Sequence, residues 1–257
     1  MSKKIATYLL LAVFILSLGL VGCGKQTNSS TAKVLRVGAE TTFPPFEFQD
    51  ETSKEYTGFD MDLARAIGKQ MGYEVQIQNI GFDGLIPALD AGTIDMAASA
   101  MTITDERAKK VNFSQPYYKS GLSIVVKSSN AVINGFKDLE GKRIAVQIGT
   151  TGAEAAHKIK NAQVREFNSS SEAYIELKNN GVDAVVNDLP VNAYYLTKSG
   201  DKDAKLVSEV ANSEYYGLAT AKKNTELNEK VNKALDELKK NGEYEKIYIK
   251  WFGKKPE

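Results

Sequence analysis

The chain has 257 residues, and 33 Lys and Arg against 32 Asp and Glu give it a formal net charge of +1. This balance offers no basic footprint for nucleic acid, so we expect no nucleic-acid partner. Cys23 is the only cysteine and His157 the only histidine, which excludes an internal disulfide and metal sites built on cysteine or histidine clusters. We therefore expect neither a metal nor a cofactor.

The N-terminal segment has the pattern of a secretory signal. Lys3 and Lys4 precede an apolar run over residues 5–20, and a small residue stands directly before Cys23. The run has the length of a signal-peptide core and is marginal for a membrane span. A cysteine at this place resembles a bacterial lipobox, in which the thiol is lipidated, as with palmitate, and the chain is cut just before it. We predict a signal peptide at residues 1–22 and a lipid anchor on Cys23; the alternative is an uncleaved N-terminal anchor.

The body of the chain begins with a first series of strands and helices. Apolar alternation and helical periodicity place these elements at residues 34–38, 60–71, 73–79, 84–91 and 94–99. In the first helix, Leu63 and Ile67 share one face, and Gly72 stands where the helix should end. This pattern predicts a helix packed by one face on a sheet.

A second series follows the pair Tyr117-Tyr118. Its elements are predicted at residues 143–148, 163–167, 169–180 and 183–187. Ser169 with Glu172 has the spacing of a capping box, and a long amphipathic helix with apolar positions from Leu227 to Leu238 ends near Gly242.

Two series of alternating strands and helices predict an α/β protein of two lobes, each with a doubly wound, mostly parallel sheet. The extended polar and aromatic stretches that flank the second series are expected to be the crossovers between the lobes. The predicted division is a tether at 23–33, a first lobe at 34–118 and 216–257, a second lobe at 123–211, and a two-strand hinge at 119–122 and 212–215.

Ligands of open α/β sheets bind beyond the carboxyl ends of the strands, so residues at these ends are the candidates for a binding site. Arg107 could hold a carboxylate by two parallel hydrogen bonds, and Asp188 could take an ammonium. The turn 149–152 offers free N–H groups to an anion. The structural alternatives are a surface arginine, a helix N-cap before Pro190, and an ordinary strand-to-helix turn. The candidates are Glu40, Phe43, Phe82, Ser99, Ala100, Thr102, Arg107, Gln147, Thr150, Thr151 and Asp188.

Several blocks together resemble the polar amino-acid-binding proteins of ABC importers, the family-3 extracellular solute-binding proteins. Residues 58–63 (GFDMDL) fit the family signature, and 99–107 (SAMTITDER) look like its ligand loop. Residues 113–118 (FSQPYY) resemble its approach to the hinge, and 244–253 its usual ending. The matches come in family order from about Val34 to the end. The resemblance implies a type II periplasmic-binding-protein fold whose lobes close on the ligand by hinge bending.

The resemblance also implies a role for the residues at the main-chain end of an amino acid. Arg107 would clamp the α-carboxylate, helped by the backbone N–H groups of Thr102 and Thr151. Asp188, the carbonyl of Ala100 and the hydroxyl of Thr102 would hold the α-ammonium.

The charge balance then predicts the side chain of the ligand. Glu40 is left without a partner, and a buried lone carboxylate is costly, so a cationic side chain would neutralise it. Phe43 and Phe82 would sandwich that side chain and suit a planar guanidinium. Glutamine-binding relatives typically carry Lys where Gln147 stands, and one has His where Asn187 stands. We predict a basic amino acid, arginine first, then lysine, ornithine or histidine; glutamine and cystine are the alternatives.

The resemblance implies a monomeric, lipid-anchored protein at the outer face of the bacterial membrane that serves a permease with a separate ATPase. The chain has no G-x-x-x-x-G-K-[ST] loop, so it does not encode nucleotide hydrolysis itself. Other functions on the same fold are an enzyme such as a cyclohexadienyl dehydratase, and an adhesin or ligand sensor. We expect a binding protein without catalytic residues.

Overall fold

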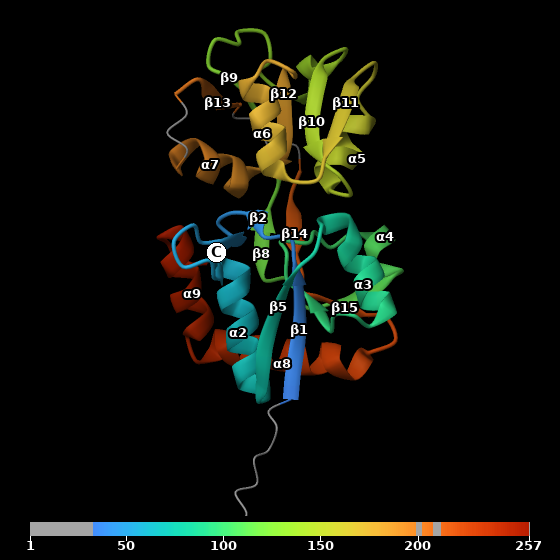
Figure 1. The fold of residues 1–257 in the computed structure, drawn as a ribbon, viewed down its shortest axis with the longest axis vertical. Coiled ribbons are helices and arrows are strands. Elements are labelled where there is room, and N and C mark those ends of the chain that lie inside the picture. The colour runs from blue at the N-terminus through green and yellow to red at the C-terminus, as the bar shows by residue number, and fades with distance from the viewer. Residues whose placement is uncertain (1–32, 199–201, 208–211, 257) are drawn as a thin grey trace, which may run out of the picture. The chain divides into compact units, whose positions relative to one another are not determined.

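The computed structural model describes residues 33–198, 202–207 and 212–256 (Figure 1). Cys23, the predicted signal peptide and nearly all of the predicted tether lie outside the described residues. Within the described part of the chain, no helix has the length and apolar character needed to span a membrane.

The first sheet has five strands in the order β5-β1-β6-β15-β7. β1 (Lys33–Ala39) pairs in parallel with β5 (Tyr73–Asn79) and with β6 (Met96–Ala97). β15 (Ala219–Ala221) runs antiparallel between β6 and β7 (Val111–Phe113), so the chain returns to this sheet after building the second one. The strand predicted at 94–99 is thus shorter, because only Met96 and Ala97 pair with β1.

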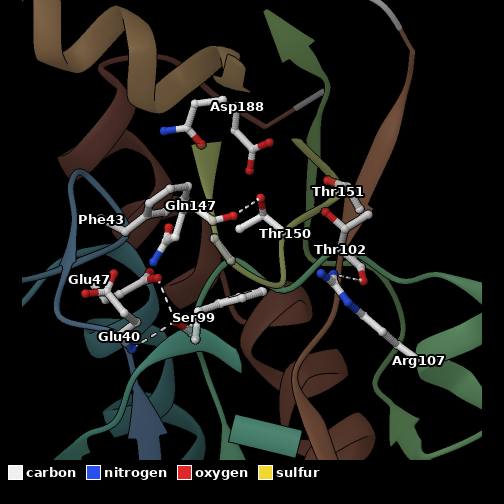
Figure 2. A pocket seen from close by; sticks show the side chains of 13 residues that line it. Glu40, Phe43, Glu47, Ser99, Thr102, Arg107, Gln147, Thr150, Thr151 and Asp188 are labelled. Atoms are coloured by element: carbon white, nitrogen blue, oxygen red, sulfur yellow. Dashed lines mark hydrogen bonds between the residues drawn. The ribbon is translucent and has the colours of Figure 1, made fainter. Parts of the chain in front are cut away.

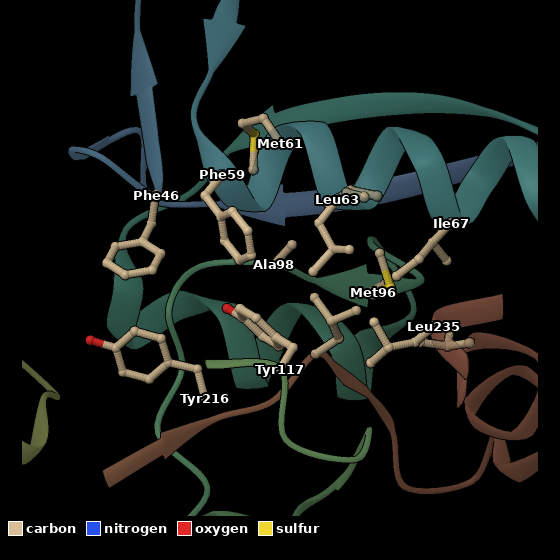
Figure 3. Close-up of a cluster of buried hydrophobic side chains, with 14 of the residues drawn as sticks. Phe46, Phe59, Met61, Leu63, Ile67, Met96, Ala98, Tyr117, Tyr216 and Leu235 are labelled. Atoms are coloured by element: carbon tan, nitrogen blue, oxygen red, sulfur yellow. The ribbon is translucent and has the colours of Figure 1, made fainter. Parts of the chain in front are cut away.

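Several helical segments belong to the first lobe. They are α2 (Phe59–Met71), η1 (Phe82–Gly84), α3 (Leu85–Ala91), α4 (Asp105–Ala108), α8 (Thr225–Lys240) and α9 (Glu243–Phe252). In α2 the predicted face is buried, and Gly72 ends the helix in the left-handed conformation at φ 75°. Figure 3 shows Leu63 and Ile67 of α2 facing Leu235 of α8 across the core. The amphipathic helix predicted near the C-terminus is α8.

The second sheet has five strands in the order β11-β10-β12-β9-β13. β10 (Arg143–Gln147) is parallel to β11 (Gln163–Phe167) and β12 (Ala184–Asp188), whereas β9 (Leu122–Lys127) is antiparallel to β12 and β13 (Ala204–Val207). The remaining elements are η2 (Phe136–Leu139), α5 (Thr151–His157), α6 (Ser170–Lys178) and α7 (Leu189–Lys198). Ser169 and Glu172 form the predicted capping box at the start of α6.

Two antiparallel strands, β8 (Tyr118–Ser120) and β14 (Glu214–Tyr216), lie between the sheets and carry the chain from one to the other (Figure 1). The rings of Tyr118 and Tyr216 stack across this pair, with centroids 5.5 Å apart. The fold is therefore the predicted one, with two α/β lobes joined by a two-strand hinge. The lobe limits given above stay a prediction.

The segment after β1 forms a small three-stranded sheet in the first lobe. It consists of β2 (Thr42–Phe43), β3 (Glu47–Gln49) and β4 (Tyr56–Thr57). Gly58, at φ 129°, follows β4, and a Cβ atom there would lie 2.0 Å from the carbonyl oxygen of Phe46. Only glycine accepts both this backbone angle and this approach, which explains the first residue of the GFDMDL block.

Candidate ligand-binding site

One cavity of about 320 Å³ is lined by all of the residues proposed from the sequence (Figure 2). Parallel strands explain the convergence, because Glu40 and Ser99 follow β1 and β6 of the first sheet while Gln147 and Asp188 end β10 and β12 of the second. Two further residues line the cavity, Glu47 and Asn187. The sequence reasoning did not consider Glu47, and it compared Asn187 with a relative without naming it as a site residue.

Arg107 is 7% exposed and not a surface arginine. Thr104 caps the short helix α4 by accepting a hydrogen bond from the backbone N–H of Arg107 at 3.2 Å. The guanidinium donates to the carbonyl of Thr102 at 2.8 Å and to the carbonyl of Gly149, in the second lobe, at 2.9 Å. It also lies 5.2 Å from the ring centroid of Phe82. No salt bridge joins it to a carboxylate in the described part of the chain, so its charge is available to an anion.

Two buried glutamates stand on the opposite side of the cavity. Glu40 accepts a hydrogen bond from the Thr42 hydroxyl at 2.7 Å, and Glu47 accepts one from the Ser99 hydroxyl at 2.9 Å. The Oε2 atoms of both glutamates are buried and, among the described residues, have no hydrogen-bond partner. Burial raises the pKa of Glu40 and raises that of Glu47 well above its usual range, although the hydrogen bond from Thr42 offsets part of the rise at Glu40.

Asp188 is a third buried carboxylate. Its Oδ2 accepts a hydrogen bond from the hydroxyl of Tyr216, on the hinge strand β14, at 2.5 Å. Burial, with a smaller contribution from Glu214, raises the pKa of Asp188 to about 7. A cation placed beside this carboxylate would favour its ionised form.

Glu214 connects the two lobes from the hinge. It accepts hydrogen bonds from the hydroxyl of Thr102 in the first lobe at 3.0 Å and from the hydroxyl of Thr151 in the second lobe at 3.1 Å. The donated proton leaves the lone pairs of the Thr102 oxygen free for an ammonium. The sequence reasoning missed Glu214, because nothing in the segment around it marks a glutamate that faces inward.

The remaining predicted residues complete the wall. Thr150 caps α5, accepting from the N–H of Ala153 at 3.1 Å, and Gln147 donates to the carbonyl of Asn168 at 3.1 Å. Ala100 has a positive φ of 45°. Its backbone N–H donates a hydrogen bond to the buried Asp60 at 2.8 Å, which stabilises this conformation. Phe43 and Phe82 line the cavity from different segments of the first lobe.

The described residues contain no group of three or more His, Cys, Asp or Glu side chains arranged to hold a metal ion. Two α/β lobes on a two-strand hinge, with a cavity lined by charged and aromatic residues from both, define a binding protein of the type II periplasmic class. The chain belongs to the family of bacterial extracellular solute-binding proteins, family 3, whose sequence profile matches residues 35–254. It is therefore an extracytoplasmic protein.

The chain is similar to several amino-acid-binding proteins. It is 36% identical to the arginine-binding extracellular protein ArtP of Bacillus subtilis over 95% of this chain and 96% of that protein. It is 37% identical to a probable histidine-binding protein of Campylobacter jejuni over 97% of this chain and 98% of that protein. The L-cystine-binding protein TcyJ of Escherichia coli is 34% identical over 85% of this chain and 82% of its own length.

Three solved structures share the fold. An ancestral arginine-binding protein bound to arginine has a TM-score of 0.83 and 48% identity, covering 85% of this chain and 98% of its own. An ancestral arginine-binding protein bound to glutamine has a TM-score of 0.80 and 48% identity, with coverages of 86% and 98%. The ancestral amino acid-binding protein AncCDT-1, a precursor of cyclohexadienyl dehydratase, has a TM-score of 0.79 and 42% identity, with coverages of 85% and 95%.

Proposed function

We propose that this protein captures a basic L-amino acid, arginine first and then lysine, ornithine or histidine, and delivers it to the permease of an ABC importer. The observation that carries the proposal is the excess of buried carboxylates over cations in the cavity. Of the thirteen residues that line it, all in the described part of the chain, Arg107 is the only cation, while Glu40, Glu47 and Asp188 are acidic.

The α-carboxylate and α-ammonium of an amino acid would each pair with one charged residue of the cavity. Arg107 would bind the α-carboxylate and Asp188 the α-ammonium, as in the family resemblance. Glu40 and Glu47 then remain, each with a buried oxygen that has no partner among the described residues. Burying such a group costs free energy unless a cation or a donor meets it, and a guanidinium or ammonium on the ligand supplies both. Phe43 and Phe82 would enclose this cation with their rings.

The proposed site consists of the eleven residues named from the sequence, with Glu47 and Asn187 added. The names of similar proteins support the assignment, since two of them are described as arginine- or histidine-binding. Contacts between the lobes support a closing mechanism, in which a ligand held by both lobes favours the closed form through its higher affinity for it. The permease would recognise that form.

Titration calorimetry of the purified protein against all amino acids, ornithine and cystine tests the proposal. Tight binding of arginine and lysine with weak binding of glutamine is the expected result. Binding of glutamine alone would keep the family and refute the charge argument. Glutamine is the second candidate because a similar structure holds it. Cystine is the third, because its second ammonium could also meet Glu40 and a relative is named for it.

We further propose that the protein binds without catalysis, is lipid-anchored through Cys23, and acts as a monomer. Both charges of Arg107 and Asp188 are used in holding an amino acid, which leaves no group assigned to a reaction. Turnover of prephenate or arogenate would contradict this part of the proposal. Sensitivity of processing to globomycin tests the anchor, and loss of arginine uptake on gene deletion separates transport from a sensor or adhesin role.

A further inference from the structure

A relay of buried, hydrogen-bonded side chains lies behind the cavity wall in the second lobe. Asn187 lines the cavity from β12, and its Nδ2 donates to the hydroxyl of Tyr174, on α6, at 3.1 Å. That hydroxyl lies 2.6 Å from Oδ1 of Asn192, on α7, which is fully buried. The ring of Tyr174 stacks on that of Tyr195 with centroids 3.9 Å apart, which fixes the position of the hydroxyl.

The direction of every hydrogen bond in this relay follows from Asn192, the residue furthest from the cavity. The Nδ2 of Asn192 donates to the hydroxyl of Ser123 at 2.8 Å and to the backbone carbonyl of Asn187 at 3.1 Å. Carbonyl oxygens only accept, so the amide of Asn192 cannot be turned round, and its Oδ1 faces Tyr174. The hydroxyl of Tyr174 must therefore donate to Asn192. Burial raises the pKa of Tyr174, so the hydroxyl keeps this proton.

The orientation of Asn187 follows from this direction. Because the proton of Tyr174 points to Asn192, only its lone pairs face Asn187, and Asn187 must offer its amide N–H to them. The Oδ1 of Asn187 is then turned away from the relay, and no hydrogen bond to it occurs among the described residues. Asn187 therefore presents a hydrogen-bond acceptor, its Oδ1, to the cavity.

This acceptor stands on the Glu40 side of the cavity. In the parallel register of β10 and β12, Ala145 pairs with Val185, which places Gln147 level with Asn187 and on the same face of the sheet. Gln147 lies beside Glu40, as Figure 2 shows. The part of a ligand that reaches Glu40 would thus also face Asn187.

We propose that Asn187 is a specificity-determining residue whose carbonyl oxygen accepts a hydrogen bond from the cationic side chain of the ligand, and that Tyr174 and Asn192 are positioning residues that hold it in this orientation. The inference rests on the proposed function, because it assumes a ligand with donors at this end. A neutral ligand that brings an oxygen to the same place meets an acceptor that cannot rotate, and is disfavoured.

Substitution of Tyr174 by phenylalanine tests the inference with L-arginine and L-citrulline as probes. Citrulline has the shape of arginine but carries an oxygen in place of one nitrogen. Tyr174→Phe keeps the stacked ring and removes the hydroxyl, so Asn187 becomes free to turn. The ratio of arginine to citrulline affinity, measured by calorimetry, should fall by about tenfold or more, the size expected for one hydrogen bond to a charged group. In the same background, Asn187→Asp should restore the ratio, because both carboxylate oxygens accept.

The control is Tyr194→Phe, which removes a hydroxyl from α7 outside the relay and should leave the ratio unchanged. A Tyr174→Phe protein that binds both ligands with an unchanged ratio, or loses both equally, would overturn the inference. Failure of the wild-type protein to bind any basic amino acid would instead refute the proposed function.

A measurement without ligand keeps the inference testable even if Tyr174→Phe does not fold. In 15N-labelled wild-type protein, one side-chain amide proton of Asn187 should exchange slowly with solvent, because it is donated to Tyr174. Exchange of both protons at the rate of an exposed asparagine would overturn the relay.

Discussion

The hydroxyl of Ser99 donates a hydrogen bond to Glu47 across 52 residues of sequence and at 2.9 Å. The same hydroxyl accepts a hydrogen bond from the backbone N–H of Glu40 at 3.0 Å. Ser99 thus ties the end of β1 to β3 and holds two glutamates at one end of the cavity. The negative charge at this end of the cavity therefore comes both from the short antiparallel strand β3, which carries Glu47, and from the end of β1, which Glu40 follows.

Glu47→Gln and Glu40→Gln are each expected to weaken arginine binding by about 10- to 100-fold, because a hydrogen bond between two charges becomes one to a neutral amide. Glutamine binding should stay equal or become tighter. The unliganded variants should be as stable as the wild type or more stable, since a buried carboxyl group with one unpartnered oxygen is replaced by a neutral amide. Calorimetry and thermal unfolding measure the two effects.

Glu51→Gln is the matched control, because Glu51 is exposed on the turn between β3 and β4. It removes the same charge without touching the cavity and should leave arginine affinity within about twofold. Equal losses in Glu47→Gln and Glu51→Gln would show that only net charge matters.

The sequence predicted those parts of the site that depend on local pattern. β5 spans the predicted residues, α2 ends at the predicted glycine, and the residues at the ends of the parallel strands do line one cavity. Glu47 was missed because it lies in a run of Phe and Pro that favours a core assignment. Its only signal is a single charge between Phe46 and Phe48.

Other features depend on pairings that no local pattern records. The strands β9, β13 and β15 were not predicted, although residues 216–257 were expected to return to the first lobe, because the pairing of each strand depends on partners far away in the chain. The same holds for the relay behind Asn187, in which α6, α7 and β9 each contribute one side chain. Helical periodicity predicts that Tyr174 is buried, but not which group its hydroxyl meets.

Arginine affinity should fall as the pH is lowered through 7. Burial raises the pKa of Asp188 from 3.8 to about 7, and an ammonium binds the ionised form. Below pH 7 the carboxylate must first lose a proton, which costs up to about tenfold in affinity per pH unit. Calorimetry between pH 5.5 and pH 8.5, in buffers of different ionisation enthalpy, should also show proton release on binding; an affinity that does not change over this range would contradict the assignment.

The unliganded protein should show the opposite trend. A carboxyl whose pKa is raised by folding stabilises the native state at pH values below its unfolded pKa, and this contribution is lost as the pH rises through the folded pKa. Asp60, with a pKa raised to about 7 by burial, acts in the same direction as Asp188. The melting temperature without ligand should therefore increase from pH 8 to pH 6, while the increment added by arginine becomes smaller. Asp60→Asn should reduce the first trend, because only the contribution of Asp188 remains of the two, and should leave the second unchanged.

Gly58→Ala should destabilise the fold by about 2–4 kcal/mol, because the new Cβ meets the Phe46 carbonyl oxygen in a backbone conformation that alanine disfavours. Gly72→Ala is the control: its φ of 75° is also positive, but nothing lies within 4 Å of the added atom. It should cost only about 1–2 kcal/mol. Urea unfolding measures the loss of stability in both variants. Equal losses would show that the Phe46 carbonyl moves away from the added Cβ atom without a free-energy cost.

Glu214→Ala should weaken the binding of every amino acid by a similar factor, about tenfold. The carboxylate accepts hydrogen bonds from Thr102 in one lobe and Thr151 in the other, so its loss removes a link between the lobes without removing a residue that lines the cavity. Because the link contacts both lobes and not the ligand side chain, the ratio of arginine to lysine affinity should not change. X-ray scattering of the variant with saturating arginine should give a larger radius of gyration than the wild type. A changed ratio with an unchanged radius would show that Glu214 acts on the ligand through the charge of Asp188, and that the hinge is held by other contacts.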